Sequence, residues 1–385
     1  MPPEENPDYL HDQLITYIGN KRALLPFIGE GVQYVMERTG HRQLDCLDVF
    51  SGSGIVSRYF KQYARSLTAN DMELYSEIIN RCYLSNEKEI NMDILREKYN
   101  ALTDAVAEEL RHTNCHGFIS EFYAPCDENN VQEGERCFYT PYNARYIDTV
   151  RQCITEMIPS SLQQYFIAPL LAEVSVHANT GGVFKGFYKD SKTGRGKFGG
   201  NGSNALNRIR GTIVLPFPVF SSFSCPFRIF RSDANELAGK DVLYAGLPGG
   251  MFDLAYIDPP YNQHPYGSNY FMLNLIASYK QPDAAEMSRV SGIPCGWNRS
   301  QYNRKKHAAE TLSFLVRSLR AKYLLVSFNS EGFITRDEMM EILGGAGSVK
   351  VFESPYNVFR ASRNLRKRAV HVSEYLYVVE KKIST

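Results

Sequence analysis

The chain has 385 residues, a formal net charge of +1 and 43% apolar residues. This length suits two domains, or one domain with a large insertion, around an ordinary hydrophobic core. The near-zero charge excludes a polycationic chain, so any contact with nucleic acid has to come from local clusters of Lys and Arg. The 8 Cys are scattered along the chain, which favours reduced thiols over a disulfide framework.

Neither export nor metal binding is indicated by the sequence. The N-terminal residues are acidic and proline-rich and lack the features of a signal peptide, and no apolar run is long enough to span a bilayer. We therefore expect a soluble, cytoplasmic protein. One cluster, formed by His112, Cys115, His116, Cys126 and Cys137, has spacings unlike those of paired zinc ligands, so we expect no metal site.

The first predicted element is a loop that leads into a helix. The Gly19-Asn20 pair signals a turn, and apolar residues then recur at helical spacing over 24–36. Tyr17 and Lys21 therefore stand near the start of a helix.

A strand predicted over 44–49 runs into a glycine turn, Phe50-Ser51-Gly52-Ser53-Gly54, and a helix follows. The two glycines let the backbone turn sharply and approach a ligand, and the start of the helix offers free N–H donors. A second strand over 65–70 ends at Asp71, where an acid can accept hydrogen bonds from ribose hydroxyls. The pattern predicts a nucleoside-binding unit, although Ser57 replaces the third glycine of the dinucleotide fingerprint.

The middle of the chain, over 81–225, has a different character. Helices are predicted over 74–110 and 160–177, and a loop near 139 enters another helix. Between residues 185 and 210 there are seven Lys or Arg and one acid. The aromatic residues Phe184, Phe187, Tyr188 and Phe198 precede or are interleaved with these charges. Basic residues meet phosphates and aromatic faces can stack on bases, so we expect a nucleic-acid contact here.

Two further strands are predicted to end in acids. The strand over 227–231 precedes Asp233, and the strand over 252–257 ends in Asp258-Pro259-Pro260-Tyr261. Neither strand nor helix continues through the two prolines, which leaves a stiff elbow with one acid, one free carbonyl and one aromatic ring. Strands over 323–328, 348–352 and 374–380 complete the chain, with a basic run over 360–368 before the last of them.

Alternating strands and helices predict an α/β fold with a parallel sheet. The four strand ends at 50–54, 71, 233 and 258–261 would then converge on one cleft at its C-terminal edge. We expect a catalytic domain made of 1–80 and 226–385, with 81–225 as a large, mostly helical and loop insertion.

Three motifs in this order resemble those of the amino-directed DNA methyltransferases, in particular adenine-N6 methylases of the Dam-like kind. The motifs are Tyr-Ile-Gly-Asn-Lys-Arg over 17–22, Phe-Ser-Gly-Ser-Gly and Asp-Pro-Pro-Tyr, and the resemblance covers 14–73 and 227–335. It implies a Rossmann-like methyltransferase sheet, S-adenosylmethionine as methyl donor and double-stranded DNA as substrate. It also implies a cognate restriction endonuclease as a partner. We expect the insertion at 81–225 to be the DNA target-recognition region. It precedes the third strand here, whereas Dam-like enzymes usually place target recognition after that strand.

The resemblance also assigns roles to residues. Tyr17 and Lys21 would help to hold the cofactor, the glycine turn would wrap its methionine end, Asp71 would bind its ribose and Asp233 its adenine. The full expected cofactor site is Tyr17, Lys21, Phe50, Ser51, Gly52, Ser53, Gly54, Asp71, Met72, Asp233, Ala234 and Asp258.

The elbow residues suit transfer to an amine. The Asp258 carboxylate and the Pro259 carbonyl can each accept one N–H bond from an exocyclic amine, which frees the nitrogen lone pair for in-line attack on the methyl group. Asp258 would stabilise the positive charge that develops on the nitrogen. Tyr261 can stack on a base flipped from the duplex. The expected catalytic set is Asp258, Pro259, Pro260 and Tyr261.

Several alternatives stay open from the sequence. The nearest is transfer to cytosine N4, which uses a similar elbow. Methylation of RNA or protein, a non-catalytic nucleic-acid-binding module and a dinucleotide-dependent oxidoreductase fit the motifs less well.

Overall fold

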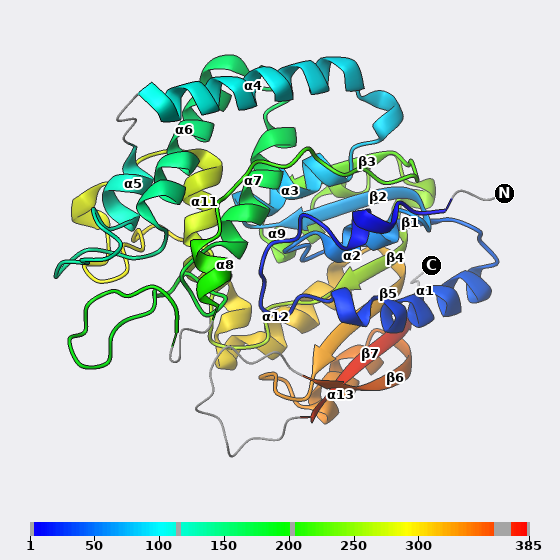
Figure 1. Cartoon of the computed structure of the whole chain (residues 1–385). Coiled ribbons are helices and arrows are strands. Elements are labelled where there is room, and N and C mark those ends of the chain that lie inside the picture. Colours follow the sequence, from blue (N-terminus) through cyan, green and yellow to red (C-terminus); the bar gives the residue numbers. More distant parts are fainter. Residues whose placement is uncertain (1–3, 113–116, 201–204, 358–370, 383–385) are drawn as a thin grey trace.

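A seven-stranded sheet forms the centre of the molecule (Figure 1). The computed structural model describes residues 4–112, 117–200, 205–357 and 371–382. The strand order is β3-β2-β1-β4-β5-β7-β6, in which β7 is antiparallel to both of its neighbours and the other pairings are parallel. The strands are β1 (Leu44–Asp48), β2 (Ala64–Asp71), β3 (Phe227–Arg231), β4 (Phe252–Ile257), β5 (Ala321–Asn329), β6 (Gly347–Asn357) and β7 (His371–Lys381).

The sheet changes its direction of growth between β1 and β4. The chain adds β2 and β3 on one side of β1, and then returns to place β4 and β5 on the other side. Every residue of β1 and β4 is buried, as expected for parallel strands that are covered on both faces. The loop after β1 and the elbow after β4 therefore emerge side by side at the switch point, where open α/β sheets bind ligands.

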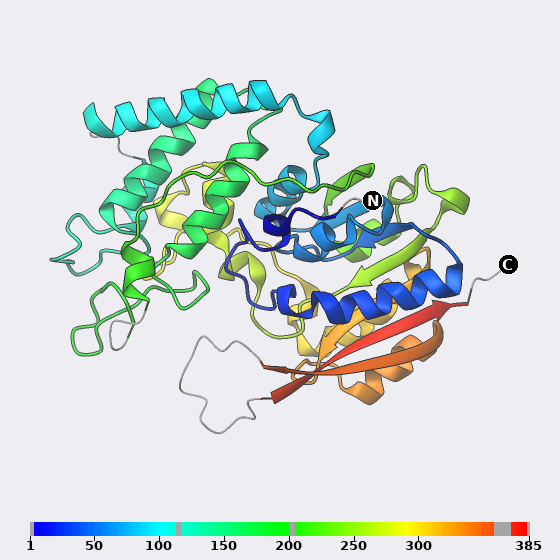
Figure 2. The ribbon, with the colours of Figure 1, turned by 45° about the vertical axis from the view of Figure 1, so that its right-hand side comes forward.

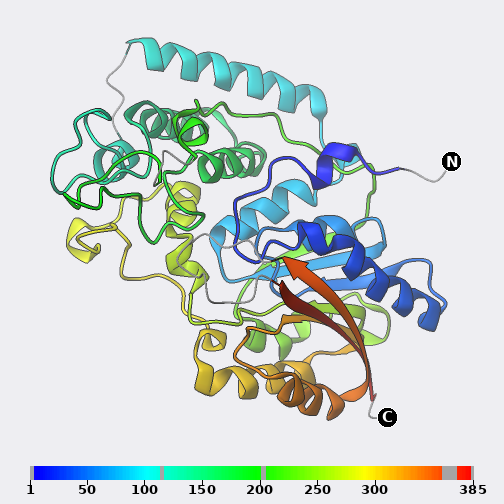
Figure 3. The same cartoon turned by 60° about the horizontal axis from the view of Figure 1, so that its bottom comes forward.

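Helices cover both faces of this sheet. On one face, Ile28 and Val32 of α1 are buried in the same cluster as Leu254 of β4. On the other, Leu312 of α12 is buried with Ala255, the next residue of β4, since successive side chains of a strand point to opposite faces. Figure 3 shows β6 and β7 between α1 and the pair α12 and α13. The helices are α1 (Leu25–Thr39), α2 (Ile55–Phe60), α3 (Leu74–Tyr83), α4 (Met92–His112), α5 (Phe118–Tyr123), α6 (Pro141–Met157), α7 (Gln164–Val176), α8 (Leu206–Arg210), α9 (Ala234–Ala238), α10 (Tyr266–Asn269), α11 (Phe271–Ser278), α12 (Lys305–Ser318) and α13 (Arg336–Gly344).

The helices of the insertion build a core of their own beside the sheet. Leu95 of α4, Ile147 of α6 and Leu170 of α7 are buried in one cluster with Ile79 of α3 and Leu273 of α11. In Figure 2 these helices lie at one side of the sheet, and the long strands β6 and β7 lie at the other. The predicted boundary at residue 81 falls inside α3, and α11, which follows β4 in the chain, belongs to this helical core.

The predicted α/β class is confirmed, and one long predicted helix differs. The helix expected over 74–110 is two helices, α3 and α4, separated by residues 84–91. Asn86 in this break binds the backbone of Cys225 twice: its amide nitrogen donates to the carbonyl oxygen at 3.0 Å, and its side-chain oxygen accepts from the backbone N–H at 3.2 Å. This contact between distant segments holds Asn86 in an extended conformation, which local helix propensity cannot predict.

Some expectations fall on residues outside the described part of the chain. These are the basic run over 360–368 and the side chains of His112, Cys115 and His116. Within the described ranges, no group of three or more His, Cys, Asp or Glu is placed to hold a metal ion. No helix in these described ranges has the length and apolar character needed to span a membrane.

Candidate active site

The glycine turn after β1 is tied to the end of β2. Gly52 and Gly54 have φ values of +52° and +76°, which side chains with a Cβ rarely adopt. A Cβ on Gly52 would also come within 2.9 Å of the Tyr17 ring. The backbone N–H of Gly52 donates to Asp71 Oδ2 at 2.8 Å. Only glycine therefore lets the turn lie this close to both Tyr17 and Asp71.

Asp71 stands at the tip of β2 with both carboxylate oxygens in use. Its Oδ1 accepts from the backbone N–H of Glu73 at 2.9 Å, and its Oδ2 accepts from Gly52. Burial raises the pKa of Asp71, and the N–H donors of Glu73 and Gly52 oppose that shift. The Asp71 carboxylate therefore links the loop after β1 to the loop after β2 through hydrogen bonds. It also lines the pocket between these loops.

The elbow after β4 carries a buried charge network. Asp258 Oδ1 lies 3.3 Å from Lys21 Nζ, and Lys21 also contacts Glu374 Oε1 at 2.6 Å. Ser327 Oγ of β5 donates to the same Glu374 oxygen at 2.7 Å. Burial raises the pKa of Asp258 to about 6; the ammonium of Lys21 acts in the opposite direction, and Glu374 adds to the increase. Lys21 therefore pairs with the expected catalytic acid, a contact that its sequence position did not reveal.

An aromatic stack forms another wall of the site. The Tyr17 ring lies 5.0 Å from Tyr266 and 4.7 Å from Tyr270 between centroids, in stacked orientations. The hydroxyl groups of Tyr17 and Tyr75 are 3.2 Å apart, and the backbone N–H of Ile18 donates to the Tyr270 hydroxyl at 2.7 Å. These contacts fix the segment that carries Tyr17 and Lys21 against α3 and the helices α10 and α11.

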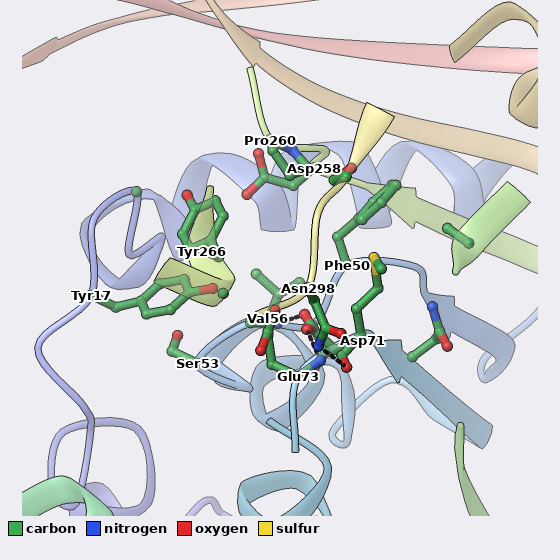
Figure 4. Close-up of a pocket in the computed structure, with 18 of the residues that line it drawn as sticks. Tyr17, Phe50, Ser53, Val56, Asp71, Glu73, Asp258, Pro260, Tyr266 and Asn298 are labelled. Carbon is green, nitrogen blue, oxygen red and sulfur yellow. Dashed lines mark hydrogen bonds between the residues drawn. The ribbon is translucent and has the colours of Figure 1, made fainter. Parts of the chain in front are cut away.

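These elements enclose one pocket (Figure 4). In the figure, Asp258 and Pro260 lie at the top of the view and Asp71 and Glu73 toward the bottom, with Tyr17 at the side. Most of the expected cofactor residues contribute to its lining, as does one of the two elbow prolines. The expected residues that line it are Tyr17, Lys21, Phe50, Ser51, Gly52, Ser53, Asp71, Met72, Ala234, Asp258 and Pro260.

Four expected site residues are not part of this lining. Asp233 is the N-cap of α9, where its Oδ1 accepts from the backbone N–H groups of residues 235 and 236. Its neighbours in the chain, 232 and 234, do line the pocket. Gly54 is the N-cap residue of α2. Pro259 lies within the elbow, and the Tyr261 ring packs edge-on against Phe328 at 6.0 Å.

The structure adds residues that were not expected at the site. Glu73 is buried, accepts from the side chain of Asn274 at 2.5 Å and has a pKa raised to about 7 by burial. Glu73 follows Asp71 by two residues. A second acid so close to the end of a strand could have been predicted from the sequence to lie at the site. Asn298 donates to the backbone oxygen of Met72 at 3.1 Å, and it comes from a loop-rich segment without any motif. The other unexpected lining residues are Gly19, Ile55, Val56, Asn70, Ser232, Tyr256, Tyr266, Gly267, Ser300 and Asn303.

Comparison with known proteins agrees with this geometry. The chain matches the D12 class N6 adenine-specific DNA methyltransferase family over residues 17–199 and 249–342, more than half of its length. These ranges include the glycine turn, Asp71 and the elbow. The match covers most of the insertion as well as strands β1, β2, β4 and β5.

Curated relatives agree with this family. The type II methyltransferase M.NlaIII of Neisseria lactamica is 28% identical over 374 residues, which cover 95% of this chain and 99% of the relative. M.CviAII of Paramecium bursaria Chlorella virus 1 is 27% identical over 371 residues, with 95% and 98% covered. M.FokI of Planomicrobium okeanokoites is 27% identical over 381 residues, which cover 96% of this chain but 53% of that relative.

The match to an adenine-specific family favours adenine over cytosine and argues against the non-catalytic and oxidoreductase alternatives. The chain therefore belongs to the D12 class N6 adenine-specific DNA methyltransferase family and is a DNA methyltransferase that acts on the N6 amine of adenine.

Proposed function

We propose that the protein transfers the methyl group of S-adenosylmethionine to the N6 amine of an adenine flipped out of duplex DNA in the cytoplasm. The observation that carries this proposal is the shared pocket: the glycine turn, Asp71 and Asp258 come from three strand ends and line the same cavity.

The pocket residues suit S-adenosylmethionine chemically. Gly52 leaves space next to the Tyr17 ring that a Cβ would fill, and Phe50 and Val56 add apolar surface to the lining of the pocket. Asp71 can accept from ribose hydroxyls. The cofactor would supply an electrophilic methyl group on a positively charged sulfonium.

The elbow then acts on the substrate amine. Asp258 and the carbonyl oxygen of Pro259 accept the two N–H bonds, which withdraws the nitrogen lone pair from the purine ring and directs it at the methyl group. Asp258 balances the positive charge that develops on the nitrogen. Tyr261 stacks on the flipped base, whose extrusion costs about a few kcal/mol.

A direct experiment tests this proposal. The protein is incubated with methyl-labelled S-adenosylmethionine and duplex DNA, and the DNA is then digested to nucleosides. N6-methyladenine is the expected product, with heat-inactivated protein as the control. Label in N4-methylcytosine, or no transfer from this donor, would contradict the proposal.

Methyl transfer is expected to slow as the pH falls through about 6. Asp258 accepts the amine only as a carboxylate, and its pKa is raised by burial to about 6. Below that pH the ionised fraction, and with it kcat/KM, falls by about tenfold per pH unit. Single-turnover rates measured across this range check the expectation. A rate that stays level would rule out Asp258 as the acceptor.

We also propose that the insertion contacts DNA through a basic loop. Lys185, Lys189, Lys192 and Arg195 are exposed, so they are free to meet phosphates. The aromatic residues play a different part, because Phe184 is 2% exposed and lies in the core of the insertion. The loop therefore supports phosphate contact rather than stacking of Phe184 on bases.

Neutralising the four basic residues of this loop to Gln should weaken DNA binding. The slope of log K against log [salt] is expected to become less negative by about 0.9 for each phosphate that the loop no longer neutralises. Anisotropy titrations of labelled duplex at several salt concentrations measure both effects. A matched control neutralises Arg42, Lys240, Arg317 and Lys382, which are exposed near the opposite edge of the sheet. Equal effects in both variants would remove the loop from the DNA-binding surface.

The names of the relatives extend the proposal to a partner. M.NlaIII and M.CviAII are named type II methyltransferases. We propose that this protein likewise works alongside a cognate restriction endonuclease and protects DNA from it. DNA methylated to completion by the protein is then expected to resist cleavage by that endonuclease, whereas unmethylated DNA is cut.

A further inference from the structure

The ammonium group of Lys21 lies between two carboxylates. Its Nζ is 2.6 Å from Glu374 Oε1 and 3.3 Å from Asp258 Oδ1. Lys21 is 5% exposed and Glu374 is 3% exposed. Lys21 therefore makes its closer contact with the residue that does not line the pocket.

We propose that Glu374 is a positioning residue for methyl transfer: it holds the Lys21 ammonium and so leaves the Asp258 carboxylate able to accept the substrate amine. The inference rests on the proposed role of Asp258. With Lys21 and Asp258 alone, the site would hold a neutral ion pair, and the lysine would compete with the substrate N–H for the carboxylate.

The charges of Lys21, Asp258 and Glu374 indicate that Glu374 does more than stabilise the fold. One buried ammonium needs one counterion, and Asp258 already provides it. A second buried carboxylate is costly to desolvate, yet Glu374 is present and is itself hydrogen-bonded by Ser327. The three groups together carry a net charge of −1, so that with Glu374 paired to Lys21 the Asp258 carboxylate keeps its negative charge for the substrate nitrogen.

The last strands of the sheet place Glu374 at this point. Glu374 lies on β7 opposite Asn329 in the antiparallel pairing with β5. Ser327 lies two residues earlier on β5, on the same face of the strand. Because β7 is hydrogen-bonded to both β5 and β6, its backbone is fixed, and the Glu374 carboxylate is held within reach of Lys21 although it stays outside the pocket lining.

Replacing Glu374 with Gln tests this inference. The single-turnover rate at saturating cofactor and DNA is expected to fall by about tenfold or more, while both dissociation constants stay nearly unchanged. The acid limb of the pH–rate profile should move to lower pH, because Glu374 is one of the charges that raise the pKa of Asp258. A purely structural residue would not produce that shift.

Other titratable groups also lie near Asp258, and Glu374→Gln does not change any of them. Lys21 faces it from the N-terminal segment, Tyr256 and Tyr261 from its own strand and elbow, Tyr266 from α10, and the more distant Asp48 from β1. Glu374→Gln leaves these groups in place. The shift of the acid limb therefore reports the loss of the Glu374 charge and the response of Lys21 to it.

The matched control is Glu380→Gln. Glu380 lies on the same strand, has a side chain that is 42% exposed and pairs with Arg38 at 3.0 Å. This variant makes the same chemical change and is expected to keep the rate and the pH profile. If Glu374→Gln behaves like Glu380→Gln, the inference is overturned.

Two further variants test whether Glu374 acts through Lys21 and provide a second test if Glu374→Gln does not fold. In a Lys21→Met background and at a pH well above the acid limb, Glu374→Gln should cause no further loss of rate, because there is no ammonium left for Glu374 to hold; a further loss would contradict the inference. Should Glu374→Gln fail to fold, Ser327→Ala removes the hydrogen bond that positions Glu374. Glu374 then holds Lys21 less firmly and Lys21 pairs more closely with Asp258, so the rate and the acid limb are expected to shift in the same direction as in Glu374→Gln. An unchanged Ser327→Ala would then overturn it. Retention of activity in Asp258→Ala would instead refute the proposed function.

Discussion

Asp258→Ala is expected to lower the rate of methyl transfer by at least about 10²–10³-fold. The substitution removes the acceptor for one N–H bond of the substrate amine and the charge that balances the developing cation. Both interactions are stronger in the transition state than in the ground state, so the loss should appear in the single-turnover rate constant.

The fold should tolerate this substitution well. Lys21 keeps Glu374 as a counterion at 2.6 Å, so no buried charge is left without a partner. DNA affinity and the thermal midpoint are therefore expected to change little. Asp241→Ala serves as the control, because Asp241 precedes the same strand and its side chain is 90% exposed. A variant of Asp258 with normal activity would falsify the catalytic assignment.

Asp71→Ala is expected to weaken binding of S-adenosylmethionine by about 10–100-fold. Hydrogen bonds to a charged group are worth about 1.5–3 kcal/mol each, and about 1.4 kcal/mol corresponds to a tenfold change in affinity. The change acts twice, because the carboxylate faces the pocket and also holds the N–H groups of Gly52 and Glu73.

Calorimetric titration with S-adenosylmethionine measures this effect. Asp241→Ala again provides the control for loss of an aspartate in the same domain. An Asp71→Ala protein that binds the cofactor with unchanged affinity would remove Asp71 from the ribose site.

The strand-end motifs could be predicted because local physics decides them. The Gly52 and Gly54 turn needs positive φ, and the Pro259-Pro260 pair stops the chain from continuing as a strand or helix beyond Asp258, which directly follows β4. When strands alternate with helices, the C-terminal ends of the parallel strands meet at one edge of the sheet. The sequence alone therefore predicts that Asp71 and Asp258 lie close together.

Asp233 shows the limit of the same argument. The position after β3 is at the pocket edge, since Ser232 and Ala234 line it. The Asp233 carboxylate caps α9, because an aspartate that precedes a helix finds free N–H donors within its own turn. An acid after a strand can therefore serve a ligand or a helix, and the sequence pattern is the same in both cases.

The sequence by itself determined the α/β alternation, the glycine turn and the elbow that carries Asp258. Each depends on residues adjacent in the chain, whose backbone preferences act locally. Only the tertiary structure decided that β7 lies between β5 and β6, that α11 joins the core of the insertion and that Glu374 meets Lys21 across 353 residues. Such pairings depend on which strand edges and apolar faces the rest of the chain leaves available, and no local pattern records that choice.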